Sequence, residues 1–257
     1  MTALLQLTAR PMTLPPLWGS FHILFLVLGA IAALIFSRLA AGCGERGARR
    51  IYLTVFVILA AGEIYKQLFS YYIVMKGSYD WWIFPFQLCS MPIYLTPLAA
   101  FLPDGRARRT ICTFLMDFSL LGAIATLAYP AGIMREYLAL TLHGFLWHIV
   151  LLFLGLFILM HGDADLSARG FFRTLPLFGL CCALAELFNC LFHSRGEINM
   201  FYISPFEIST QPVFSDIDRI LSRPAGIALY LLAAAAGAGL LHFLAGRCSR
   251  HAGRTRK

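Results

Sequence analysis

Seven stretches of almost purely apolar residues divide the chain, and they restrict its possible folds more than any other feature of the sequence. Each stretch has about the 20 residues that a helix needs to cross a hydrocarbon core roughly 30 Å thick. We therefore expect an all-α fold, a polytopic transmembrane bundle of seven spans that forms one domain over residues 1–257. The expected spans cover residues 17–41, 51–75, 83–102, 110–129, 137–160, 171–192 and 224–245.

The small number of charged residues supports this fold class. Hydrophobic residues make up 59% of the chain and Asp, Glu, Lys and Arg only 13%, whereas about a quarter of an average soluble protein is charged. The net charge of +8 does not indicate a nucleic-acid partner, because the basic residues lie in short loops and in the C-terminal tail, without a basic stripe that aromatic residues interrupt. The seven cysteines are scattered without a CxxC motif, which argues against a disulfide framework.

Basic residues are distributed unevenly among the loops, and this distribution predicts the orientation of the bundle. Arginine is frequent in the loops after the first and third stretches and in the C-terminal tail. The loops after the second and fourth stretches have one basic residue each, Lys76 and Arg135. Loops with an excess of Lys and Arg stay in the cytoplasm. We therefore expect a multi-pass protein of the cell membrane with its N-terminus outside and its C-terminus in the cytoplasm. The basic residues that decide this are Arg46, Arg49, Arg50, Arg106, Arg108, Arg109, Arg247, Arg250, Arg254, Arg256 and Lys257.

Polar side chains occur at a similar depth in five of the expected spans, in the half that we predict to be the outer one. Ionisable residues inside a membrane are energetically costly and usually face a cavity or a partner. We therefore expect these residues to line one polar pocket that opens outward; the alternative is a set of separate hydrogen bonds that hold helices together. The residues are His22, Glu63, Lys66, Gln67, Gln87, Cys89, His143, His148, Glu186 and Asn189, followed by Asn199 in the next loop.

A cysteine and a histidine within this layer have the residue types of a nucleophile and its base. Cys89 and His143 each lie six residues into their expected spans, which places both roughly 9 Å below the outer interface at about 1.5 Å per residue. A histidine is a common base for generating the reactive thiolate. Two other interpretations stay open for Cys89: a small buried apolar residue, or a disulfide with Cys190 at similar depth.

The other polar residues also have structural interpretations. Glu63 and Lys66 are three residues apart on one helix face and can neutralise each other. His148 follows His143 by five residues, so the two point about 140° apart, and we expect His148 to be a packing residue. Asp117 lies in the middle of its span, where it is expected to form a hydrogen bond with a neighbour in its protonated form. His22, His143 and Glu186 lack a recognised ligand spacing, so no metal is expected.

Three short motifs resemble those of the YwaF/TMEM164 integral membrane family. The stretch Pro85-Phe86-Gln87-Leu88-Cys89-Ser90 is similar to the Pro-x-His-x-Cys-Ser stretch of that family, and Leu142-His143-Gly144 resembles its His-Gly step in the fifth helix. The region of Asn189, followed by Asn199-Met200-Phe201-Tyr202 and Pro205, resembles its Asn … Asn-Tyr-Met-Tyr … Pro pattern. The order and spacing of the motifs fit along nearly the whole chain.

The resemblance implies a seven-helix fold and, in the TMEM164 branch, a lipid acyltransferase. In that branch a cysteine takes a fatty acyl group from a phospholipid and passes it to a lysophospholipid; carried over, Cys89 is the nucleophile and His143 its base. Two positions depart from the family pattern. Gln87 replaces the histidine that precedes the cysteine and cannot act as a base, although it can donate a hydrogen bond to an oxyanion. Gly122-Ala123-Ile124-Ala125, before Tyr129-Pro130, departs from the usual Thr-Pro.

The sequence therefore predicts a membrane-embedded lipid acyltransferase that needs no cofactor. Membrane lipids are its expected partners, and no soluble protein partner is implied. Gln87 and Asn189 are expected to donate to the oxyanion, and Glu63 or Glu186 to orient the histidine. The remaining supporting residues are Lys66, Asn199, His22 and His148.

Two other function classes remain open. The first is a carrier or channel for a small solute, which would need polar groups through to the inner face, where the spans are almost purely apolar. The second is a non-catalytic integral membrane protein in which the polar layer only joins helices.

Overall fold

A computed structural model describes the backbone of residues 2–254 and the side chains of residues 2–249. The described chain is helical without named strands; an isolated antiparallel bridge joins Pro11 to Tyr137. The helices are α1 (Thr2–Thr8), α2 (Ser20–Ala40), α3 (Glu45–Phe69), α4 (Met91–Phe101), α5 (Arg106–Ala128), α6 (Leu138–His161), α7 (Ala168–Phe192), α8 (Phe214–Ile220) and α9 (Arg223–Arg254). Short helical turns join or extend them, namely Ser70–Val74, Trp81–Ile83, Leu88–Ser90, Pro130–Gly132, His193–Arg195 and Met200–Tyr202.

Six helices are long and apolar enough to cross a membrane, which agrees with a multi-pass membrane protein. They are α2, α3 with the turn that continues it to Val74, α5, α6, α7 with the turn that continues it to Arg195, and α9 up to Ser249. The expected count of seven spans is not confirmed, because the third expected span, 83–102, does not form one helix long enough to cross a membrane. Its regular helix, α4, has only 11 residues, which is roughly 17 Å of helix and about half of a hydrocarbon core.

Proline explains why the third expected span is short. Pro85 restricts the residue before it to extended conformations, and Phe84 has φ −55° and ψ 135°. The apolar run around Trp81 and Trp82 therefore cannot continue as a helix into Leu88. Pro92 lies in the first turn of α4, where a missing N–H costs nothing. The result is an irregular segment, residues 75–87, which we call the strap, followed by a helix of half length.

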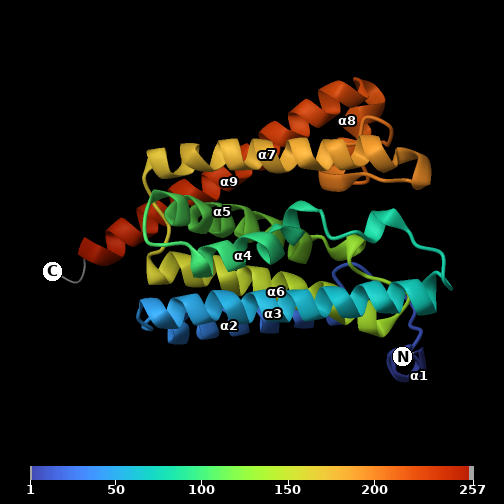
Figure 1. Cartoon of the computed structure of the whole chain (residues 1–257), viewed down its shortest axis with the longest axis horizontal. Helices are drawn as coiled ribbons and strands as arrows, with labels where there is room; N and C mark the ends of the chain where they lie inside the picture. Colours follow the sequence, from blue (N-terminus) through green and yellow to red (C-terminus); the bar gives the residue numbers. More distant parts are fainter. Residues whose placement is uncertain (1, 255–257) are drawn as a thin grey trace.

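The central helix of the bundle is α5. It packs against α4, α6, α7 and α9, and 61% of its most apolar window is buried, compared with 17% for α2. Figure 1 shows α7 and α9 on one side of α5 and α6, and α2 and α3 on the other. Asp117 of α5 is buried within this packing and has a partner, because His242 of α9 has its Nδ1 3.0 Å from the carboxylate.

The two termini lie at opposite ends of the long axis of the bundle (Figure 1). The loops that join α2 to α3 and α4 to α5 lie at the same end as the C-terminus, and we call this the arginine-rich end. Arg108 and Arg49 bind carboxylates there. Arg256 and Lys257, and the side chains of Arg250 and Arg254, lie outside the described residues. The side of the membrane that this end faces stays a prediction from the distribution of basic residues.

Candidate functional site

Cys89 lies in the turn that begins a short helix, in the half of the bundle opposite the arginine-rich end. The strap ends at Gln87, which is extended, and the turn Leu88–Ser90 leads directly into α4. The backbone N–H of Ser90 donates to the carbonyl of Gln87 over 2.8 Å. The N-terminus of a helix carries a partial positive charge that favours a thiolate. The sequence positions the cysteine in this way because Pro85 delays the start of the helix.

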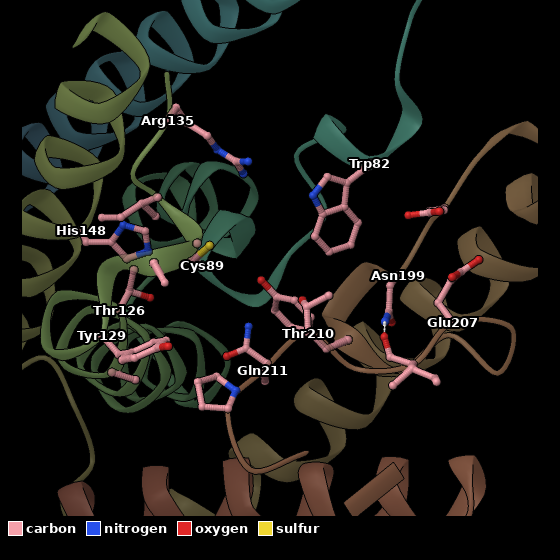
Figure 2. A pocket seen from close by; sticks show the side chains of 18 of the residues that line it. Trp82, Cys89, Thr126, Tyr129, Arg135, His148, Asn199, Glu207, Thr210 and Gln211 are labelled. Atoms are coloured by element: carbon pink, nitrogen blue, oxygen red, sulfur yellow. Dashed lines mark hydrogen bonds between the residues drawn. The ribbon is translucent and has the colours of Figure 1, made fainter. Parts of the chain in front are cut away.

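Two cavities meet at Cys89. The larger has a volume of about 930 Å³ and lies under the loop that follows α7; we call it the vestibule. The smaller has a volume of about 360 Å³ and lies between α3, α6 and the strap; we call it the inner cavity. Cys89, His148, Arg135, Trp82 and Tyr202 line both. Figure 2 shows the vestibule, with Cys89 and His148 on the same side of it in this view.

The structure brings together some of the expected residues and separates others. Glu63, Lys66, Gln87, Cys89, His143 and His148 line the inner cavity, and Asn199 lines the vestibule. His22 is elsewhere: its Nδ1 accepts from the backbone of Trp18 and its Nε2 donates to the carbonyl of Leu127 over 2.8 Å. Glu186 has only weak contacts on α7, with Asn189 at 3.5 Å and Cys190 at 3.8 Å. Cys89 and Cys190 are both free thiols, so they are not joined by a disulfide.

The polar residues of α3 hold the strap. Lys66 pairs with Glu63 over 2.8 Å and donates to the carbonyl of Ile83 over 3.0 Å. Gln67 donates to Glu63 over 2.6 Å and to the same carbonyl over 2.7 Å, and it accepts from the hydroxyl of Tyr79. Burial and the nearby Glu63 raise the pKa of Tyr79, so the phenol keeps the proton that it donates. These contacts satisfy non-helical backbone at membrane depth, and Glu63 neutralises Lys66 instead of orienting a histidine.

Two side-chain amides hold the loop that follows α7. Asn189 accepts from the backbone N–H of Met200 over 2.7 Å and donates to its carbonyl over 3.2 Å. Gln87 accepts from the N–H of Phe201 over 2.8 Å and donates to the carbonyl of Asn199 over 3.2 Å. The two amides that we expected to donate to an oxyanion are therefore engaged with backbone in this structure. What they hold is a loop that forms a wall of the vestibule.

This loop contains an uncommon backbone conformation. Phe201 and Tyr202 have φ values of 55° and 59°, in the left-handed region that non-glycine residues rarely adopt. Arg223 also holds this turn, by donating to the carbonyl of Tyr202 over 2.8 Å, while its other nitrogen pairs with Asp218. Strained residues of this kind persist only where their surroundings fix them. The result is that the ring of Tyr202 lines both cavities.

The two histidines of α6 have different surroundings. His148 is buried, and its Nδ1 lies 2.8 Å from the carbonyl of Gly144. The ring of His143 lies 5.3 Å from that of Trp147, whose Nε1 donates to the carbonyl of Cys89 over 3.0 Å. The side chains of His143 and His148 point about 140° apart around α6. Both line the inner cavity, because this cavity extends around more than one face of α6.

A model of the TMEM164 family matches residues 17–243, which is most of the chain. The chain belongs to the TMEM164 family. No curated protein matches the chain, and no solved structure matches it. The match covers every residue that lines the two cavities.

In this TMEM164 family member, reasoning from the sequence overlooked three residues of the site. Tyr202 was noticed only as part of a motif, although Tyr202 and Arg135 each line both cavities. Trp147 appeared to be one more apolar residue of a span, yet it is hydrogen-bonded to the backbone of Cys89. A usable signal was its spacing, because Trp147 follows His143 by one helical turn.

Proposed function

We propose that this TMEM164 family protein is a membrane-embedded lipid acyltransferase in which Cys89 carries the acyl group between two phospholipids. The observation that carries the proposal is the position of Cys89 at the junction of two cavities. The larger is lined by charged and polar side chains, including Arg135, Glu197 and Glu207, and has room for a polar headgroup. An enzyme that exchanges an acyl chain between two lipids needs a nucleophile that both can reach.

The reaction has two balanced halves. In the first, Cys89 loses its proton to a histidine of α6, and the thiolate attacks the ester carbonyl of a phospholipid. A C–S bond forms, the C–O bond to the glycerol breaks, and the leaving oxygen takes the proton from the imidazolium. In the second, the hydroxyl of a lysophospholipid gives its proton to the histidine and attacks the thioester. The thiolate then leaves and is protonated again.

The start of α4 contributes to both halves. A thiol in the first turn of a helix is close to the positive end of the helix dipole, which lowers the free energy of its anion. Trp147 holds the carbonyl of Cys89 and thereby restricts the direction of the thiol. We expect the site to open to the outer leaflet, since the basic loops are at the opposite end.

Packing in the other half of the bundle supports a one-sided site over a channel. Residues 112–120 of α5 are all buried, and they are surrounded by α4, α6, α7 and α9. A solute that entered the vestibule would meet this packed segment. The function that these contacts support best is chemistry on a molecule that enters and leaves from the same side.

The test is transfer of a labelled acyl chain between lipids by the purified protein in vesicles. The vesicles contain a phospholipid with a labelled acyl chain and an unlabelled lysophospholipid. We expect Cys89→Ala to abolish transfer while Cys190→Ala, which removes an exposed thiol outside both cavities, retains it. In the wild type, mass spectrometry should find the acyl group on the peptide that contains Cys89. Transfer that persists in Cys89→Ala contradicts the proposal.

A further inference from the structure

We propose that aromatic rings between the strap and α7 form a lateral gate, through which the acyl chain of a membrane lipid reaches the inner cavity and Cys89. The rings of this gate are those of Trp81, Phe84, Phe188 and Phe192. The proposal deepens the proposed acyl transfer and rests on it for the identity of the lipid, while the gate itself can be tested without that reaction.

The short α4 leaves room for such a gate. Because α4 begins only at Met91, the segment that lies between α3 and α7 beyond its start is the strap (Figure 1). The ring of Phe84 in the strap lines the inner cavity. The same ring stacks on that of Phe188 of α7, with the ring centroids 4.8 Å apart and the planes at 18°. Separation of these two rings would therefore open the inner cavity beside α7.

The strap is held to its two neighbours by different interactions. Lys66 and Gln67 of α3 donate to the carbonyl of Ile83, and such bonds are costly to break in hydrocarbon, where no water replaces them. Among the described residues the strap forms no hydrogen bond with α7 itself, and its contacts with this helix are between rings. Trp81, for example, stacks on Phe192 with the centroids 4.3 Å apart. The strap is therefore fixed on the side of α3 and held by apolar contacts on the side of α7.

Apolar contacts of this kind can open easily in a membrane. A ring that leaves another ring in water loses the hydrophobic contribution to their contact. In a membrane the ring meets lipid chains instead, which are as apolar as the ring that it left. What remains to keep the gate closed is the moderate attraction between stacked rings. The rings can therefore separate by side-chain rotation while the hydrogen bonds of Ile83 hold the backbone of the strap.

The far side of the gate faces lipid. Leu184 and Leu191 lie on the same face of α7 as Phe188, about one helical turn before and after it. They are 45% and 65% exposed, on a helix that is long and apolar enough to cross a membrane, so this face contacts lipid chains. The gate therefore separates lipid chains from the inner cavity. An acyl chain can enter sideways here, while the charged side chains of the vestibule are available to the headgroup.

Phe188 is the residue of choice for a test. Its ring stacks on Phe84 and also contacts Phe192, with the centroids 4.5 Å apart, so one substitution weakens the gate at two contacts. Phe188 lines neither cavity. Phe188→Ala therefore leaves the side chains around Cys89 unchanged.

Two thiol reagents distinguish the gate from the vestibule. Pyrene maleimide dissolves in the hydrocarbon of the membrane, and a trimethylammonium methanethiosulfonate stays in water. Each is added to the full-length protein in vesicles, and modification of the Cys89 peptide is followed by mass spectrometry. Phe188→Ala should speed the reaction with pyrene maleimide by about three- to tenfold, the factor that corresponds to the loss of aromatic contacts. The reaction with the cationic reagent, which enters through the vestibule, should stay within about twofold of the wild type.

Two matched variants control for the substitution itself. Phe188→Trp keeps an aromatic ring in the gate and should react with both reagents within about twofold of the wild-type rates. Phe172→Ala removes a ring of the same size that is 62% exposed at the opposite end of α7, and both rates should stay unchanged. A misfolded variant exposes Cys89 to both reagents, so the ratio of the two rates identifies an opened gate.

The outcomes separate the gate from the reaction. A ratio that rises in Phe188→Ala, with a wild type that transfers no acyl group, supports the gate and contradicts the acyltransferase. If Phe188→Ala raises both rates together, Phe192→Ala decides, because it removes the ring that stacks on Trp81. A wild-type ratio in Phe192→Ala then overturns the gate, as does a wild-type ratio without a rise of either rate in Phe188→Ala, or an equal rise of the ratio in Phe172→Ala.

Discussion

The two ends of the bundle both contain networks of charged and polar side chains. At one end the network joins helices and loops directly, and at the other it holds non-helical segments around two cavities. At the arginine-rich end, Arg108 is buried between Asp104 and Asp163, and Tyr52 donates to Asp163 over 2.5 Å. These contacts join α3, the loop before α5, and the loop after α6 directly, side chain to side chain. At the other end the polar side chains of α3 and α7 bind backbone, and they hold the strap and the loop around two cavities.

The difference shows that the presence of polar residues in a membrane protein does not by itself reveal whether they pack helices tightly together or surround a cavity. Ion pairs between helices draw the helices together and exclude water. Amides and lysines that bind backbone carbonyls allow a chain to leave the helical conformation at membrane depth. A site can therefore form where the partners of the polar groups are peptide groups. Three further experiments test this comparison.

The largest expected effect is at the arginine-rich end. Arg108→Met removes one partner of the buried pair with Asp163 and leaves this carboxylate without its arginine, which should lower the free energy of unfolding by about 3–5 kcal/mol. Thermal unfolding of the purified protein measures this. The control is Arg219→Met, whose partner Asp216 is exposed, with an expected cost below about 1 kcal/mol. Equal effects of the two substitutions would show that the network at this end does not hold the helices.

A smaller loss of stability and a larger change in the site are expected from Asn189→Ala. The substitution leaves the buried N–H of Met200 without its partner, at a cost of about 1–3 kcal/mol. The turn at Tyr202 should loosen, so that iodoacetamide reaches Cys89 faster than in the wild type. In Asn189→Ala the free energy of unfolding should fall and the alkylation rate of Cys89 should rise. In Arg108→Met only the free energy of unfolding should change. Unchanged alkylation in Asn189→Ala would mean that the loop keeps its conformation without the amide.

The smallest expected effect is the difference in stability between two glycine-to-alanine substitutions, one in a packed part of α6 and one beside the inner cavity. A Cβ on Gly155 of α6 would lie 2.5 Å from the Cγ of Leu120, so Gly155→Ala should cost about 1–3 kcal/mol through overpacking. A Cβ on Gly62 of α3 would lie 3.5 Å from His143 beside the inner cavity, an ordinary contact. Gly62→Ala should therefore change the unfolding temperature less than Gly155→Ala. The reverse order would mean that the inner cavity is filled in solution.

Much of the fold could be predicted from the sequence, because the relevant signal is local. Six long apolar helices and the arginine-rich loops follow directly from the sequence, since span length and loop charge depend only on neighbouring residues. The third expected span is not confirmed as a helix of full length: its residues are mostly apolar, and apolarity alone does not distinguish a helix from an irregular segment such as the strap. Pro85 was the relevant signal, since a proline restricts the residue before it.

The site could be predicted only in part, because its contacts join residues that are far apart in the sequence. Cys89 and His143, which we expected at equal depth, both line the inner cavity. The roles of Gln87 and Asn189 could not be predicted, since the side chain of Gln87 binds the backbone of a residue more than 100 positions later. The surroundings of His148 depend on the rotation of α6 and on a hydrogen bond to Gly144, and neither has a signature in composition or spacing.

Under the proposed acyl transfer, the half length of α4 sets the depth at which a lipid would present its ester. If Phe101 lies near the surface at the arginine-rich end, Cys89 is 12 residues or roughly 18 Å higher in the membrane, still about 12 Å short of the far surface of a 30 Å hydrocarbon layer. The ester of a resting phospholipid lies near that surface. A substrate therefore has to sink toward the thiol and take its headgroup with it below the level of its neighbours. The vestibule of about 930 Å³, whose lining includes Arg135, Glu197 and Glu207, would give such a headgroup polar partners during this descent.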